Sequence, residues 1–82
     1  METVFIVASS AYYDSTGEIY LGASAHRTYA AAMEAMRKDI ENEIAEHELD
    51  EDTPYELRLN ETEAQLAWGG HSFDWVIVEA NV

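Results

Sequence analysis

The sequence predicts an α+β fold, a two-layer sandwich in which one long helix packs across one face of an antiparallel sheet of three to five strands. Two observations predict it. Apolar residues alternate with other residues near both ends of the chain, and between them lies a segment rich in Ala, Met and Glu that contains neither Gly nor Pro. The 82 residues show no internal repeat and no linker. We therefore expect a single domain, 1–82.

The N-terminal part is expected to form a β-hairpin. Alternation of β-branched and aromatic residues over 3–12 predicts the first strand. Residues 14–17 are typical of a turn, with Gly17 in the left-handed conformation, and alternation resumes at Ile19.

The long helix is expected at 29–47. Thr28 is a suitable N-cap because its hydroxyl accepts hydrogen bonds from the backbone of the first turn. Apolar residues three or four positions apart would form one stripe that faces the sheet, namely Tyr29, Met33, Met36, Ile40 and Ile44.

Two further strands are expected, at 55–59 and 73–79, and the segment between them is ambiguous. Asn60 and Glu63 fit an N-cap and its reciprocal partner, which favours a short helix or turn at 61–68. The same segment alternates like a strand and is followed by Gly-Gly, which suits a hairpin loop, so a strand is the alternative. The large rings expected in the core are Phe5, Tyr55, Trp68, Phe73 and Trp75.

A run of carboxylates is the strongest functional signal. The chain has seventeen acidic residues and four basic ones, so its formal net charge is -13, more than the solubility of a small domain requires. Eight of these acids lie within fourteen residues that contain no Lys or Arg, namely Asp39, Glu41, Glu43, Glu46, Glu48, Asp50, Glu51 and Asp52. Such crowding destabilises the compact state and opposes the helix dipole, which indicates a use for the charge.

On a helical wheel the acids form two rows that flank the apolar stripe. One row is Asp39, Glu43 and Glu46, and the other is Glu34, Glu41 and Glu48. A continuous helix over 39–52 would cover about 21 Å, or roughly one charge per 2.6 Å, against about one per 1.7 Å for duplex DNA. We interpret the run as a partner-binding face that imitates nucleic acid. The alternative is the ordinary solvated side of an amphipathic helix.

In size, charge and this acidic run the chain resembles the small acidic inhibitors of phages and mobile elements, of the anti-CRISPR or DNA-mimic type. The resemblance covers composition alone, because that class shares no common fold or motif, and no residue's role is carried over from it. It implies a basic nucleic-acid-binding partner such as a CRISPR-Cas effector or nuclease, with no direct contact to nucleic acid.

The tip of the first hairpin is a second candidate binding site. Tyr12, Tyr13 and Asp14 place two aromatic rings beside an acid, a combination that suits an interface anchor. The alternative is a pair of tyrosines packed on the sheet.

The remaining features argue against catalysis. The chain has no Cys, and its three histidines, His26, His47 and His71, lie far apart without metal-binding spacing. We therefore expect no enzyme, no catalytic residue, no metal and no cofactor. The sequence shows neither a basic leader nor a long apolar stretch, so we expect a cytoplasmic protein without a membrane partner. We expect it to be either a monomer or a homodimer. A housekeeping domain adapted to strong salt is the alternative function. The concentration of acids in one segment, and the excess of Glu over Asp, argue against it.

Overall fold

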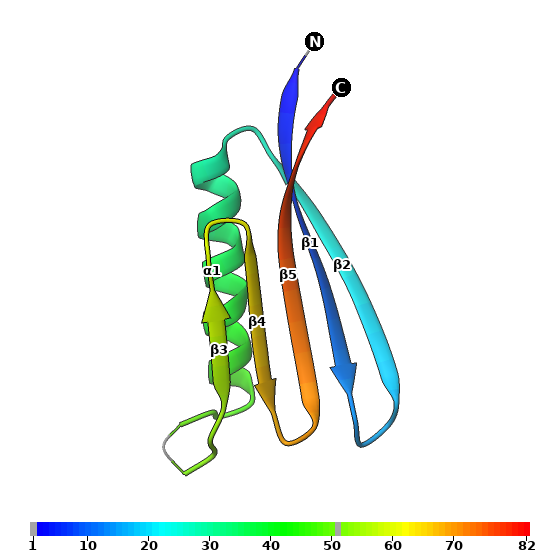
Figure 1. Cartoon of the computed structure of the whole chain (residues 1–82), viewed down its shortest axis with the longest axis vertical. Coiled ribbons are helices and arrows are strands. Elements are labelled where there is room, and N and C mark those ends of the chain that lie inside the picture. Colours follow the sequence, from blue (N-terminus) through cyan, green and yellow to red (C-terminus); the bar gives the residue numbers. More distant parts are fainter. Residues whose placement is uncertain (1, 51) are drawn as a thin grey trace.

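A five-stranded antiparallel sheet and one helix make up the computed structural model, which describes residues 2–50 and 52–82 (Figure 1). In chain order the elements are β1 Thr3–Tyr13, β2 Glu18–His26, α1 Tyr29–Glu46, β3 Glu56–Leu59, β4 Glu63–Trp68 and β5 His71–Asn81. Across the sheet the order is β2-β1-β5-β4-β3, with α1 against one face. The α+β class expected from the sequence is confirmed. Among the described residues there is no helix long and apolar enough to cross a membrane.

Glycines in the left-handed conformation form the turns of two hairpins, β1–β2 and β4–β5. Gly17 adopts φ +71° between β1 and β2, and its N–H donates to the Tyr13 carbonyl at 2.7 Å, as the left-handed turn position predicts. Gly69 and Gly70 both have positive φ, +51° and +87°, which is the signature of a two-residue type I′ turn between β4 and β5.

The preferred interpretation of 61–68 is wrong, because the segment is strand β4 and no helix forms there. Asn60 Oδ1 accepts hydrogen bonds from the N–H groups of Thr62 and Glu63 at 2.9 and 2.8 Å, as an N-cap would. Here those bonds close the turn between β3 and β4. The strand alternation prevails because it places Ala64 and Leu66 in the core.

The helix begins as predicted and ends one residue early. Thr28 Oγ1 accepts from the Ala31 N–H at 3.1 Å, and the helix ends at Glu46 with His47 as its C-cap. Glu48 then takes a left-handed φ of 52°, and the Leu49 N–H donates to the Ile44 carbonyl at 3.0 Å. This pattern is a Schellman motif without its usual glycine.

The core lies between α1 and the sheet. Its buried members are Val7, Ala32, Met36, Ile40, Leu49, Ala64, Leu66, Phe73, Trp75 and Ile77. Of the rings expected there, Phe73 and Trp75 are buried, and Phe5 and Trp68 are half-buried against them. Tyr55 stays 39% exposed just before β3, so its expected core position is wrong.

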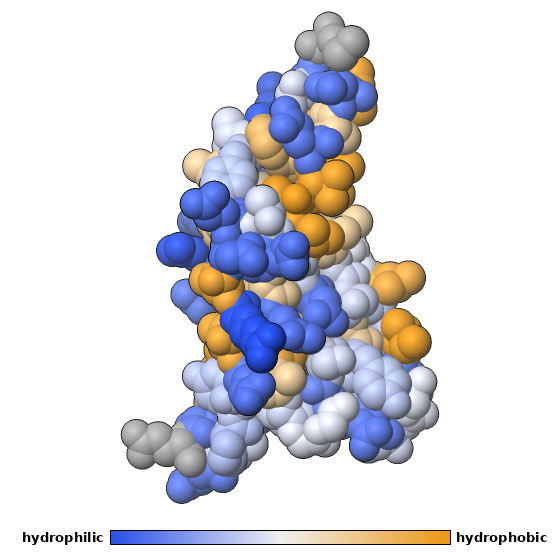
Figure 2. Space-filling view, in the orientation of Figure 1, coloured by the Kyte–Doolittle hydropathy of each residue, from blue (hydrophilic) through white to orange (hydrophobic). Residues whose placement is uncertain are grey.

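In the part of the chain that the structure describes, no element covers the other face of the sheet, which we call the open face. The pairing of β1 with β2 and β5 puts every second residue of these strands there, including apolar ones. Among them are Val4, Ile6, Ala8, Ile19, Leu21, Val76 and Val78. Figure 2 looks onto this face and shows apolar side chains at the surface.

Candidate partner-binding surface

Most of the predicted acidic run is at the surface, on the C-terminal half of α1 and the loop after it. Glu43 is half-buried, and Glu51 lies outside the described residues. The other six carboxylates form what we call the acidic surface: Asp39, Glu41, Glu46, Glu48, Asp50 and Asp52, all exposed.

Among the described residues, no Lys, Arg or His forms an ion pair with the acidic surface. Within residues 2–50 and 52–82, the one ion pair that involves the run joins Glu43 to His47. Lys38 pairs instead with Glu34, at 3.5 Å, one turn toward the helix N-terminus. The last turn of α1 holds no basic residue, so the negative end of the helix dipole adds to the negative potential.

The carboxylates of 39–52 do not all lie on one continuous helix. The helix ends at Glu46 and the chain changes direction at Glu48, so the helical part from Asp39 spans only about 10 Å. Asp50 Oδ1 accepts from the N–H groups of Asp52 and Thr53, at 2.9 and 3.2 Å, and thereby shapes the loop. The carboxylates form a short helical row followed by a bent loop.

One row of acids borders a cleft on the helix side of the sheet. Asp39 and Glu43 from α1 line it together with Tyr13, Tyr20 and Gly22 from the first hairpin. Its volume is about 260 Å³. We call it the acid-lined cleft. It gives the row an aromatic wall that helical geometry alone does not predict.

The predicted hairpin-tip site is divided between two faces. Tyr12 and Tyr13 are successive strand residues, so their side chains leave the sheet on opposite sides. Tyr13 packs among rings on the helix side, 5.4 Å from Phe73 and 6.0 Å from His47 between centroids. Tyr12 is 38% exposed on the open face. Only Tyr13 joins the acidic row.

Asp14, the third tip residue, links the two hairpins. Its backbone N–H donates to His71 Nδ1 at 3.1 Å. A Cβ placed on Gly70 would come within 2.9 Å of its carboxylate, so the two turns pack closely. Asp14 therefore has a structural use beside any role in binding.

The charges at this end of the helix shift two pKa values. Burial raises the pKa of Glu43, the nearby Glu46 carboxylate raises it further, and His47 offsets part of the rise. Burial, followed by the negative charges of Glu43 and Glu46, also raises the pKa of the Tyr13 phenol. The acids are thus close enough to repel one another and to disfavour any further negative charge.

His47 is the member of this group that sequence reasoning missed. Its Nε2 lies 3.2 Å from Glu43 Oε2, and both atoms are shielded from solvent without a hydrogen bond of normal geometry among the described residues. The i, i+4 spacing of Glu43 and His47 was the available signal. Ligand atoms of Glu43, Glu46 and His47 lie within 4.8 Å of one another, so these are the side chains that could hold a cation. That no metal binds here remains a prediction.

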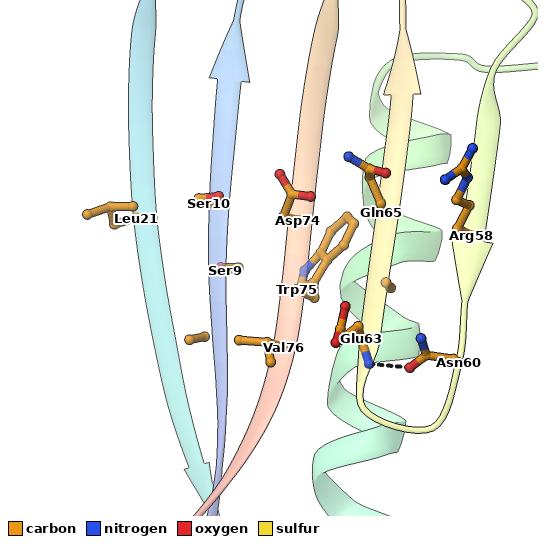
Figure 3. A pocket seen from close by; sticks show the side chains of 12 residues that line it. Ser9, Ser10, Leu21, Arg58, Asn60, Glu63, Gln65, Asp74, Trp75 and Val76 are labelled. Atoms are coloured by element: carbon orange, nitrogen blue, oxygen red, sulfur yellow. Dashed lines mark hydrogen bonds between the residues drawn. The ribbon is translucent and has the colours of Figure 1, made fainter.

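A larger, shallow depression of about 750 Å³ lies on the open face (Figure 3). A polar row crosses it, because Gln65 pairs in register with both Arg58 and Asp74. His71 faces the helix side whereas Ser72 and Asp74 face the open side, so these neighbours do not converge as a catalytic triad.

Comparison with protein-family models, with curated proteins and with solved structures found no match to this chain. Two features of its own surface bear on its function, namely the acidic surface and the acid-lined cleft beside it.

Proposed function

We propose that this protein is a non-catalytic binding protein whose acidic surface occupies, and thereby inhibits, a basic nucleic-acid-binding protein. The observation that carries the proposal is that, among the described residues, no Lys or Arg pairs with the exposed carboxylates at the C-terminal end of α1. An ordinary exposed helix would intersperse cations at i+4 for mutual support.

A basic groove evolved for phosphates can accept carboxylates for the same physical reasons. Clustered negative charge attracts the groove over long range, and contact releases counterions, so affinity should fall steeply with salt. The acid-lined cleft adds aromatic contact to this attraction. Tyr20 is 55% exposed at its wall, and tyrosine rings are frequent anchors of protein interfaces. Nucleases and CRISPR effectors are the first partners to test, in line with the class that the chain resembles.

The test compares two variants that lose the same four charges. One replaces the acids of the helix end, Glu41, Glu43, Glu46 and Glu48, by Gln. The matched control replaces four exposed acids elsewhere by Gln, namely Glu56, Glu61, Glu63 and Glu79. Each immobilised protein is incubated with lysate of its host, eluted with a salt gradient, and the captured protein is then purified for direct binding.

The proposal expects a nucleic-acid-binding protein that is captured by the wild type and by the control but not by the helix-end variant. Added DNA or RNA should displace it. If the helix-end variant binds as well as the wild type, the acidic surface is not the binding site. If both variants bind equally weakly, total charge matters and the specific surface does not. Loss of the wild-type fold at low salt would instead indicate adaptation to strong salt.

A further inference from the structure

Strand β2 is an edge strand without the usual protection. Among the described strands only β1 pairs with it. It runs for nine residues, and its stretch from Ile19 to Ala25 contains no charge and no Pro. Proteins usually keep exposed edges short, charged, bulged or covered, because an unpaired row of backbone N–H and C=O groups can pair with another strand.

The edge also exposes large apolar side chains. Leu21 is 81% exposed and Ile19 is 66% exposed, both on the open face. Glu18 and His26 stand at the two ends of the strand, and the residues between them carry no charge. A second strand laid along this edge would pair the backbone and cover part of these side chains.

We propose that β2 pairs antiparallel with β2 of a second copy of this chain, with Gly22 opposite Gly22. The sequence of the strand is complementary to itself in that register. The opposed residues would be Glu18 with His26, Ile19 with Ala25, Tyr20 with Ser24, and Leu21 with Ala23. Each large side chain meets a small one, and a carboxylate meets an imidazole at both ends.

No neighbouring register does this as well. A shift by one residue would place open-face side chains of one copy beside helix-side residues of the other. A shift by two separates Glu18 from His26 and shortens the pairing from nine residues to seven. The two-fold axis passes between the two Gly22 residues, perpendicular to the sheet, so the same strand serves both copies and both helices lie on the same side.

The pairing also places the two acid-lined clefts side by side, because Tyr20 and Gly22 of β2 line each of them. The pairing of β2 with β2 does not depend on the proposed function, and the response to salt distinguishes this dimer from a complex with the proposed partner. Each copy carries a formal charge of -13, so salt should strengthen the dimer by screening repulsion. Salt should weaken any complex formed through the acidic surface.

The test is the molar mass of the full chain by light scattering after gel filtration, at rising salt and high micromolar concentration. One variant carries Leu21→Lys and Ala23→Lys, and another carries Leu21→Glu and Ala23→Glu. In the proposed register each variant opposes like charges to its own copy. The wild type should reach twice the monomer mass as salt rises. At the lowest salt concentration at which it does so, each variant should have the monomer mass, and an equimolar mixture of the two variants should regain the dimer mass.

Val78→Lys is the control, because Val78 lies on the open face in β5, away from the edge. It should leave the dimer intact, and circular dichroism should show that all variants are folded. A wild type that stays monomeric at high salt overturns the proposal, and so does a dimer that both charged variants retain. A dimer lost in Val78→Lys but kept in the edge variants indicates face-to-face stacking of open faces instead, and also overturns it.

Discussion

Glu43 Oε2 in the last turn of α1 and Nε2 of the C-cap residue His47 lie 3.2 Å apart, and both atoms are shielded from solvent. Burial raises the pKa of Glu43 above its ordinary value of 4.5, the Glu46 carboxylate raises it further, and His47 offsets part of the rise. A carboxyl group with a raised pKa binds its proton more tightly in the folded state. Its stabilising contribution is therefore complete below the unfolded pKa and is lost as pH rises through the folded one.

The first prediction is that Glu43→Gln raises the free energy of unfolding at pH 7. The gain over the wild type should shrink as pH falls toward 4, where the wild-type carboxyl is itself protonated. Urea denaturation at several pH values measures both quantities. Glu41→Gln is the control, since Glu41 is exposed, and its effect should be smaller and less dependent on pH. A Glu43→Gln protein that is less stable at pH 7 would show that the contact with His47 outweighs burial.

The second prediction concerns the left-handed residue after the helix. Glu48 has φ 52°, a conformation that costs a residue with a Cβ about 1 to 2 kcal/mol, whereas glycine adopts it freely. Allowing for the larger chain entropy of glycine in the unfolded state, Glu48→Gly should stabilise the protein by about 0.5 to 1 kcal/mol. Glu48→Gln keeps the strain and removes the charge, so comparison of the two by thermal denaturation isolates the backbone effect. Equal stabilities would mean that the backbone effect is negligible.

The third prediction separates the adjacent tyrosines. Tyr13 packs against four rings, those of Tyr20, His47, His71 and Phe73. Tyr13→Ala should therefore cost about 2 to 4 kcal/mol, while Tyr12→Ala on the open face should cost about 1 kcal/mol or less. Denaturant midpoints measure the difference. Similar losses for both variants would show that the aromatic cluster contributes little.

The consequence for binding follows from that difference. Tyr13→Ala is unsuited to a binding assay, because unfolding would remove the surface as well as the ring. Tyr13→Phe keeps the packed ring and removes only the hydroxyl, so it is the variant to test beside Tyr12→Ala. If the tip contributes to the interface through Tyr13 alone, Tyr12→Ala should leave partner affinity unchanged.

The fourth prediction tests the turn that sequence reasoning interpreted as a helix start. Asn60 Oδ1 receives two backbone hydrogen bonds, from Thr62 and Glu63. Asn60→Ala should cost about 1 to 2 kcal/mol because both donors lose their acceptor, whereas Asn60→Asp keeps it and should cost less. Measuring the free energy of unfolding of the two variants tests this prediction. A neutral Asn60→Ala would mean that water replaces the side chain without loss.

These elements also show what sequence reasoning could and could not reach. The helix and the first hairpin were predictable because their signals are local, namely the Thr28 cap and the left-handed Gly17. The segment after Asn60 was not, since the same two hydrogen bonds begin a helix or close a turn. What decides between them is the burial of Leu66 beneath α1, which depends on residues far away in the sequence.

The candidate surface divides in the same way. The acids are evident from composition, and strand alternation alone would have placed Tyr12 and Tyr13 on opposite faces. Which of the acids are partly buried cannot be predicted from the neighbouring sequence. Glu43 is half-buried because the first hairpin brings Tyr13 over that side of the helix, and only the assembled sheet sets that position.

The last prediction uses the two glycines between β4 and β5. Both have positive φ, but their surroundings differ. A Cβ on Gly69 would meet only His71 Cδ2, at 3.8 Å, whereas a Cβ on Gly70 would come within 2.9 Å of Asp14 Oδ2. Gly69→Asn creates the Asn-Gly pair that type I′ turns favour and should stabilise the protein by about 0.5 kcal/mol through the unfolded state.

Gly70→Ala should do the opposite and cost more than about 1 kcal/mol, because strain at φ +87° combines with the clash against Asp14. Adding Asp14→Gly removes the clash and leaves the strain, so the double variant should recover part of the loss. A thermal-denaturation cycle of these variants measures the coupling between Asp14 and Gly70. A coupling free energy of zero would mean that Asp14 and Gly70 are not in steric contact in solution.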